Sequence, residues 1–189
     1  MKPRIICLSL LSALVMSSGG TRLPPVVLNM QYAGSIGLVS AGASIRLARK
    51  KLETGLLMGY LPASHGGPMT TFTAKATYNP FCLRISPSMS VQPLQTGVFV
   101  TMHTGKELER TWDKHYPDGY YMWNRSIRMH VFAGIQLSVN SPYVPDKRFA
   151  IYLECNTNDL YINRLYHNRG YMPLWDIMAL GAGVKMYFR

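Results

Sequence analysis

The sequence is poor in charged residues and, after its N-terminal segment, lacks long hydrophobic runs. Charged residues make up 15% of the 189 residues, whereas hydrophobic residues make up 48%. From residue 30 onward, no apolar stretch approaches the roughly 20 residues that a membrane-spanning helix needs. Helical membrane proteins are therefore excluded, and the apolar residues must be dispersed along the chain. The length fits one domain.

Acidic residues are also scarce. Nine Asp and Glu stand against 20 Lys and Arg, which gives a formal net charge of +11. A net positive charge of this size can favour binding to nucleic acids or to anionic lipid headgroups. Because no nucleic-acid-binding motif is present and the basic residues are spread singly, we expect no nucleic-acid partner. Phosphate-rich lipid headgroups stay open as partners.

The N-terminal segment has the three-part layout of a secretory signal peptide. Lys2 and Arg4 precede an apolar run over residues 5–16, and small residues follow at 17–20. That run is shorter than the roughly 20 residues of a membrane anchor. We therefore expect residues 1–20 to be a signal peptide, cleaved near that point, and residues 21–189 to form the mature domain.

Cysteines number only three. Cys7 lies within the predicted signal, so Cys82 and Cys155 remain in the mature chain. An exported protein can oxidise such a pair to a disulfide. The alternative, which we favour, is that both thiols are small apolar fillers of separate strands.

Apolar and polar residues alternate over most of the mature chain. Three long segments, 69–79, 127–139 and 177–188, show the period of two that is typical of half-buried strands. We predict eight strands in all, with a β-bulge near Gly37 or Gly42 in the first and a break at Pro87 in the fourth. The predicted strands are 31–47, 52–60, 69–79, 83–91, 97–103, 127–139, 148–155 and 177–188.

Eight strands return both ends of the chain to one side of a closed antiparallel barrel. With the N-terminus in the periplasm, the two longest connections fall on the extracellular side, as is usual for such barrels. An alternative with a strand over 160–167 in place of 83–91 is disfavoured because it reverses this asymmetry. The predicted extracellular connections are 48–51, 80–81, 105–125 and 157–176; the periplasmic ones are 62–68, 92–95 and 140–147.

The polar faces of the strands favour a transmembrane barrel over a soluble lipocalin-type barrel, whose apolar face surrounds a ligand. An eight-stranded lumen is just wide enough for side chains to fill it, and buried charges there must pair. We expect Glu53 and Glu154 to accept hydrogen bonds from Lys75, Arg128 and Lys185, which leaves no wide pore. The predicted lumen network is Arg46, Glu53, Lys75, Arg128, His130, Glu154 and Lys185.

Aromatic residues gather near the ends of the predicted strands. Such positions are typical of the girdles with which a membrane barrel meets the two bilayer interfaces. A soluble core would place them nearer the strand centres. The residues are Tyr32, Tyr60, Tyr78, Tyr120, Tyr121, Trp123, Tyr143, Trp175, Tyr187 and Phe188.

With these features, the chain resembles the small eight-stranded outer-membrane barrel proteins of Gram-negative bacteria. Its terminal "LGAGVKMYFR" is similar to their closing strand, although Arg189 follows the final aromatic Phe188. The segments "QYAGSIGLVSAG", "ETGLLMGYLP" and "LWDIMALGAGVKMYF" resemble an uncharacterised barrel group of the Bacteroidota type. The resemblance implies an outer-membrane location, with lipid, lipopolysaccharide and the barrel-assembly machinery as partners.

Some barrels of this kind are lipid A-modifying enzymes of the acyltransferase or deacylase type, which use a His with a Ser and a carboxylate. The candidates here are His103 and, in one loop, His115 with Asp113 and Asp118. No spacing among them indicates a catalytic triad. No metal-ligand pattern is present, so we assign neither catalytic residues nor a cofactor.

The sequence thus favours a non-enzymatic outer-membrane barrel with a structural or surface-interaction role through loops 105–125 and 157–176. Arg164, His167 and Arg169 lie in the second loop and can meet lipopolysaccharide phosphates or a surface partner. The lipid A-modifying enzyme is the alternative, and a soluble ligand-binding barrel is a third hypothesis.

Overall fold

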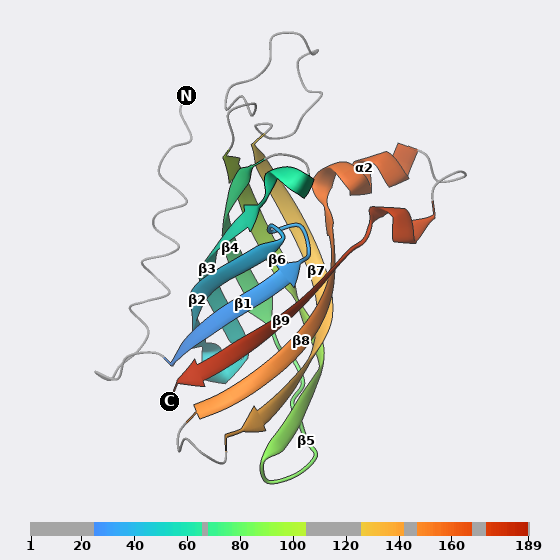
Figure 1. Cartoon of the computed structure of the whole chain (residues 1–189). Coiled ribbons are helices and arrows are strands. Elements are labelled where there is room, and N and C mark those ends of the chain that lie inside the picture. The colour runs from blue at the N-terminus through green and yellow to red at the C-terminus, as the bar shows by residue number, and fades with distance from the viewer. Residues whose placement is uncertain (1–24, 66–67, 105–125, 142–146, 168–172, 189) are drawn as a thin grey trace, which may run out of the picture.

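The computed structural model describes residues 25–65, 68–104, 126–141, 147–167 and 173–188. The fold is all-β, and its one antiparallel sheet closes on itself (Figure 1). Eight strands form the barrel in the order β1-β2-β3-β4-β6-β7-β8-β9, and β5 pairs only with β6, outside the ring. The strands are β1 (Val26–Ala33), β2 (Val39–Leu47), β3 (Leu52–Leu61), β4 (Met69–Tyr78), β5 (Leu83–Arg84), β6 (Met89–Thr104), β7 (Ile127–Asn140), β8 (Lys147–Asn158) and β9 (Ala179–Phe188).

The first and last strands close the ring. β1 pairs with β9 from Val27 opposite Tyr187 to Ala33 opposite Gly181. β4 pairs in turn with β6, from Thr70 opposite Thr104 to Tyr78 opposite Thr96. Each ring strand therefore has two hydrogen-bonded neighbours, and this closure removes the open edges that would invite pairing with other chains.

The prediction of a single strand over 31–47 with a bulge is wrong. The segment contains a reverse turn between β1 and β2. Ala33, Gly34, Ser35 and Gly37 all have positive φ angles, between 60° and 119°. A run of left-handed residues turns the chain back instead of merely bending a continuous strand, and the predicted change of face near Val39 marks the start of a new strand.

The prediction of a ring strand over 83–91 is also wrong. Only Leu83 and Arg84 form β5, and the chain then turns through Pro87 into β6. β6 contains the predicted strand 97–103 and begins eight residues earlier, at Met89. Its pairing with β7 shifts register between Gln92 and Gln95, around Pro93, which has no backbone N–H to donate.

The predicted number of ring strands, eight, is nevertheless correct. The predicted strand 31–47 is in fact two ring strands, and the predicted strand 83–91 is not a ring strand. We call the end of the barrel at which β1 finishes the upper end and the end at which it begins the lower end (Figure 1). β6 and β8 end, and β7 and β9 begin, at the upper end, whereas β7 ends and β8 begins at the lower end. These strand ends agree with the sides predicted for 105–125, 157–176 and 140–147 relative to one another. Three other connections were assigned to the wrong side: 48–51 and 80–81 lie at the lower end, and 62–68 joins two strands at the upper end. The predicted connection 92–95 is not a connection, because it lies within β6.

Short helices occur in the connections. The segment between β8 and β9 carries α2 (Asp159–His167) and η3 (Leu174–Ile177), where the sequence predicted only a loop. Two other single turns are η1 (Ala48–Lys50) and η2 (Ala63–His65). Among the described residues, no helix is long and apolar enough to cross a membrane.

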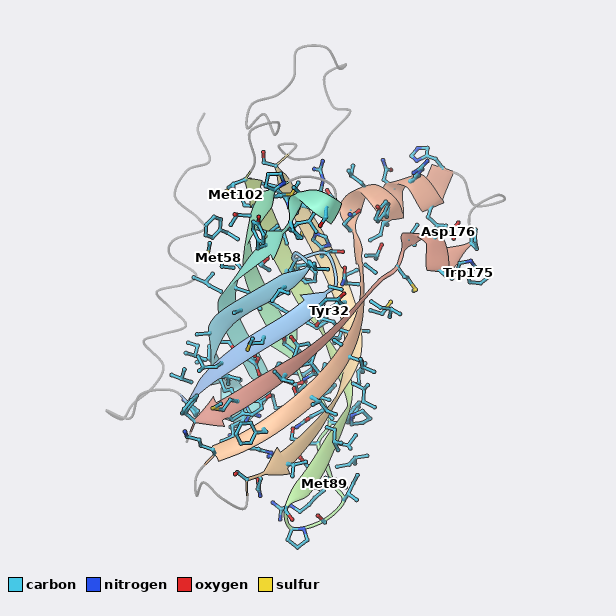
Figure 2. All side chains as sticks on the ribbon, in the orientation of Figure 1. Tyr32, Met58, Met89, Met102, Trp175 and Asp176 are labelled. Atoms are coloured by element: carbon cyan, nitrogen blue, oxygen red, sulfur yellow. The ribbon has the colours of Figure 1, made fainter. Side chains whose placement is uncertain are left out.

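Apolar side chains point away from the barrel and polar side chains point into it. Leu56 is 70% exposed and Leu180 74%, whereas Thr71 and Glu154 are each 2% exposed. Figure 2 shows Met58 and Tyr32 on the outer surface. The alternation predicted for 69–79, 127–139 and 177–188 is confirmed by the burial of β4, β7 and β9.

Several predicted girdle aromatics lie on the outer surface. Tyr32, Tyr60 and Tyr78 are each about half exposed. Tyr187 is instead 6% exposed in the lumen, so its assignment to a girdle is wrong: it follows the inward parity of Lys185. Trp175 is 74% exposed and Phe188 is half-buried. The other four, Tyr120, Tyr121, Trp123 and Tyr143, lie outside the described residues.

The two cysteines among the described residues are not joined. Cys82 is an exposed free thiol at the lower end, and Cys155 is a half-buried free thiol on β8. This agrees with the favoured interpretation of separate thiols. The predicted signal peptide at 1–20, with Cys7, lies outside the described residues.

Candidate functional site

The upper part of the lumen is closed by the chain itself. The turn between β1 and β2 folds inward, so that Ile36 is fully buried against Leu57, Phe99 and Phe132. The Thr71 hydroxyl donates a hydrogen bond to the Ile36 carbonyl at 2.5 Å. A small apolar plug therefore occupies the lumen where the sequence predicted only polar side chains.

Gly59 makes room for this plug. A Cβ atom at residue 59 would lie 1.8 Å from the Ile36 carbonyl oxygen and 2.5 Å from the Thr71 hydroxyl. Such distances are far inside van der Waals contact, so the absence of a side chain on β3 allows the turn to enter the barrel.

An ion pair lies at the centre of the lumen. Lys75 Nζ on β4 is 2.5 Å from Glu154 Oε2 on β8. The other carboxylate oxygen of Glu154 accepts a hydrogen bond from Gln31 Nε2 at 2.8 Å, and Gln31 Oε1 accepts one from the Tyr152 hydroxyl at 2.9 Å. Lys75 Nζ also lies 4.5 Å from the centre of the Phe132 ring, a distance typical of cation–π contact.

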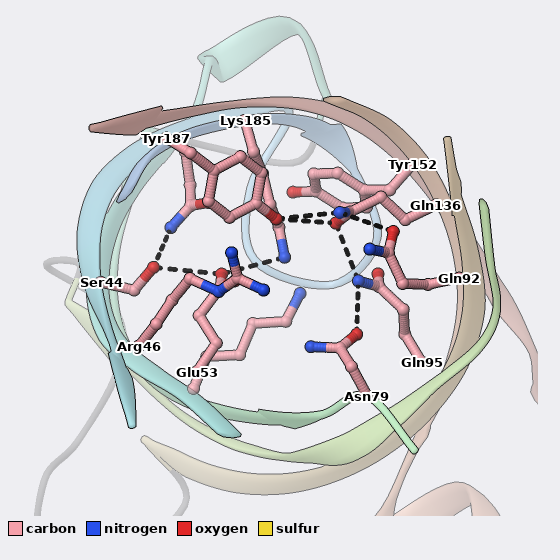
Figure 3. A network of polar contacts seen from close by, with 12 residues as sticks. Ser44, Arg46, Glu53, Asn79, Gln92, Gln95, Gln136, Tyr152, Lys185 and Tyr187 are labelled. Carbon is pink, nitrogen blue, oxygen red and sulfur yellow. Dashed lines mark hydrogen bonds and ion pairs between the residues drawn. The ribbon is translucent and has the colours of Figure 1, made fainter. Parts of the chain in front are cut away.

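A second ion pair lies nearer the lower end. Lys185 Nζ on β9 is 2.9 Å from Glu53 Oε1 on β3, and Ser44 Oγ donates to the same oxygen at 3.1 Å (Figure 3). Asn29 Nδ2 donates to Ser44 Oγ at 2.7 Å. Lys185 Nζ is also 5.0 Å from the ring of Tyr152, which places the two ion pairs in one continuous network.

Below the ion pairs, amide side chains form a third layer around Gln136. Its Nε2 donates to the Tyr187 hydroxyl at 2.9 Å and to Gln92 Oε1 at 3.0 Å. Its Oε1 accepts from Gln95 Nε2 at 2.8 Å, and Gln95 also donates to Asn79 Oδ1 at 2.8 Å (Figure 3). These uncharged groups link β6, β7 and β9 across the lumen.

The three layers fill the barrel. The cavity left between Asn29, Glu53, Lys75 and Lys185 has a volume of about 10 Å³, close to what one water molecule requires. Both pairs join strands that are not neighbours in the ring, so they cross-link the lumen. Because burying a charge without a partner costs several kcal/mol, the pairing also makes these four ionised groups tolerable inside the barrel.

Six of the seven predicted lumen residues lie in the lumen or at its lower mouth. Glu53, Lys75, Glu154 and Lys185 form the two ion pairs. The remaining residues are placed as follows: His130 stacks on Phe99 with ring centres 4.4 Å apart and lies 3.1 Å from the Thr101 hydroxyl, whereas Arg46 lies at the lower mouth, 4.8 Å from the ring of Tyr187.

The expected pairing of Arg128 with Glu53 or Glu154 is wrong. Each carboxylate binds a lysine, and Arg128 lies near the upper end of β7, where its Nη1 donates to the Ile127 carbonyl at 2.9 Å. Along the strand, Arg128 is six residues above Gly134, which stands opposite Glu154. At roughly 3.4 Å per residue this separation is too long for a direct ion pair.

The predicted surface-binding residues lie at the upper end. Arg164 and His167 are exposed on α2, and His167 Nδ1 donates to the Asn163 carbonyl at 2.9 Å. Arg169 lies outside the described residues. The helix thus brings two of the three residues to one turn of surface.

The catalytic candidates form no triad in the described part of the chain. His103 Nε2 lies 3.3 Å from the Thr101 hydroxyl, and its buried Nδ1 has no hydrogen-bond partner among the described residues. No carboxylate there orients the ring as a general base requires. His115, Asp113 and Asp118 lie outside the described residues, within which no group of three His, Cys, Asp or Glu side chains is arranged to hold a metal.

Sequence analysis missed the uncharged members of the network. Gln136 and Tyr152 were on predicted polar faces, but only charged residues and His130 were selected from those faces. Gln92 and Gln95 were hidden by the wrong boundary of β6. The available signal was strand parity: every second residue from Lys185 or Lys75 points inward, whatever its charge.

Comparison with known proteins adds no family to this description. No protein-family model matches the chain, and no curated protein matches it significantly. The functional argument therefore depends on the barrel and its lumen.

Proposed function

We propose that this protein is a non-enzymatic outer-membrane β-barrel with a plugged polar lumen. The observation that carries the proposal is the inverted distribution of side chains: Ile151 and Leu153 on β8 are 59% and 60% exposed, whereas Tyr152 and Glu154 between and beside them are 4% and 2% exposed. Water disfavours such a surface by about 25 cal/mol per Å² of apolar area. Acyl chains would remove this cost.

The apolar surface surrounds the barrel. Large exposed apolar side chains occur on β1, β2, β3, β4, β6, β7, β8 and β9. Monomeric soluble proteins rarely expose contiguous apolar patches beyond a few hundred Å². A lipocalin-type ligand barrel is disfavoured for a related reason, since its apolar side chains would surround an internal cavity.

The filled lumen supports a role other than transport. The apolar plug at Ile36, the two ion pairs and the amide layer occupy the lumen, and the cavity beside the ion pairs has a volume of only about 10 Å³. A structural or surface-interaction role through the connections 105–125 and 157–176 remains. The second connection presents exposed Tyr166 and Trp175 together with Arg164 and His167, a composition suited to lipopolysaccharide, with its acyl chains and phosphates.

Two measurements test the membrane assignment. Outer-membrane fractions of cells that express the full chain should contain the protein, and unboiled samples should migrate differently from boiled samples in gel electrophoresis. Recovery in the soluble periplasm, with no heat-dependent shift, would contradict the proposal.

The interaction role is tested separately. Replacing residues 105–125 or 159–176 by short Gly/Ser turns should preserve the heat-dependent shift and alter the permeability of the envelope. An intact envelope after both replacements would contradict the surface role. Mass spectrometry of lipid A should show the same acylation with and without the protein. A changed acylation would contradict the non-enzymatic role and favour the lipid A-modifying enzyme.

A further inference from the structure

A basic cavity occupies the lower mouth of the barrel, away from the long connections. Its volume is about 650 Å³. Five cationic side chains line it, and no acidic side chain of the described residues does. The cationic lining residues are Arg46, Arg49, Lys50, Lys51 and Arg148.

The turn between β2 and β3 supplies three of these cations, and two of them, Arg49 and Lys50, have a strained backbone. Ala48, Arg49 and Lys50 have φ angles of 47°, 55° and 70°. The left-handed region costs a residue with a side chain roughly 1–2 kcal/mol, and glycine would avoid this cost. Strain of this kind is typical of functional sites. Here it brings Arg49, Lys50 and Lys51 to the edge of one cavity.

The floor of the cavity orients its arginines. Arg46 lies over the ring of Tyr187 and donates from Nη2 to the Lys50 carbonyl at 3.1 Å. Its Nε is buried and has no hydrogen-bond partner among the described residues. Arg148 donates to Ser90 Oγ. Glu53, which stands opposite Arg46 in the pairing of β2 with β3, is paired with Lys185, whose charge offsets that of the carboxylate.

We propose that this cavity binds an anion of the phosphate class. Guanidinium groups bind phosphate oxygens through paired N–H donors, and lysines add point charges. Pro25, Pro80, Tyr187 and Phe188 form an apolar wall, which suits a phosphate attached to a short organic group. The site does not depend on where the barrel resides.

Isothermal titration calorimetry with pyrophosphate tests the site on the folded full-length protein in a non-ionic detergent. We expect saturable binding of one pyrophosphate at physiological ionic strength, where screening acts over about 8 Å. Arg49→Gln with Lys50→Gln should weaken it at least about tenfold, because two charge-assisted contacts are lost. Absence of binding to the unsubstituted protein overturns the proposal.

The matched control removes two positive charges elsewhere. Arg84→Gln with Arg128→Gln alters residues on β5 and near the upper end of β7, neither of which lines the cavity. This variant should bind pyrophosphate within about twofold of the unsubstituted protein. Equal weakening of both double variants would indicate net charge alone and overturn the site. If the cavity double variant does not fold, Arg49→Gln alone takes its place.

A second titration separates two sources of the same chemistry. Dihexanoylphosphatidylglycerol, below its micelle concentration, presents a lipid phosphate, and dihexanoylphosphatidylcholine is its zwitterionic control. Tighter binding of phosphatidylglycerol than of pyrophosphate assigns a lipid headgroup to the site, and the reverse order assigns a free phosphate compound. Equal binding of both lipids, with no binding of pyrophosphate, overturns the anion site.

Discussion

Lys75 and Glu154 meet across the lumen, with 2.5 Å between Nζ and Oε2, although β6 and β7 lie between their strands in the ring. Lys185 and Glu53 repeat this arrangement between β9 and β3. Each pair ties together walls of the barrel that share no backbone hydrogen bonds. The interior is therefore held by side chains as well as by the closed ladder.

Breaking the central pair should be more costly than replacing it. Lys75→Met leaves Glu154 charged and buried, so it should lower the free energy of unfolding by about 3–5 kcal/mol. Adding Glu154→Gln should restore at least half of the loss, because no uncompensated charge remains. Urea unfolding in detergent, followed by tryptophan fluorescence, gives the double-mutant cycle. Additive losses would show that the two residues are not coupled.

Gly59→Ala should disturb the plug at the upper end. The new Cβ would meet the Ile36 carbonyl oxygen at 1.8 Å, and overpacking of this kind costs about 1–3 kcal/mol. Urea unfolding measures the loss. Ala43→Val, on the neighbouring strand with its side chain facing outward, is the control and should be near neutral. A Gly59→Ala protein as stable as its parent would rule out the inward turn.

Ala48→Gly should stabilise the barrel by about 1 kcal/mol. Ala48 has a φ angle of 47°, which glycine adopts without a Cβ clash, and this gain exceeds the extra entropy that glycine adds to the unfolded chain. Ala74→Gly in the extended strand β4 has the same chemistry and should destabilise by about 0.5–1 kcal/mol. Changes of the same sign in both variants would contradict the strained turn.

An arginine scan along β8 measures whether the outer face meets lipid. Leu153 lies near the middle of the strand and Phe149 near its lower end, and both are exposed. In a bilayer, Leu153→Arg should cost about 2–4 kcal/mol and Phe149→Arg about 0–1 kcal/mol. Unfolding from phospholipid vesicles gives both values. On a water-facing barrel the two substitutions would have equal, small effects, and that result would contradict membrane insertion.

Several features of the fold could be predicted from the sequence because they are local. Alternation in 69–79 and 127–139 identifies the strands and their two faces, since parity is set by the pleat of each strand. The reverse turn at Gly34 was missed because glycine also marks bulges, and Pro87 was placed in a strand because its neighbours alternate. Both errors are ambiguities of local pattern that pairing with a partner strand removes.

The candidate site was predictable in its charges and not in its partners. Glu53 and Glu154 had to find cations, because an eight-stranded lumen is narrow and unpaired ions there are costly. Which cation each one bound depended on strand register, and Arg128 was excluded by its height along β7. The basic cavity was not foreseen at all, since its residues come from separate turns and strands.

By itself, the sequence determined the class of fold, the apolar and polar sides of each strand and the need for charge pairing, since these depend on neighbouring residues and on composition. The tertiary structure alone decided the pairing of Lys75 with Glu154, the entry of Ile36 into the lumen and the gathering of cations at the lower mouth. Those features require ring closure, which fixes the relative heights of residues far apart in the chain.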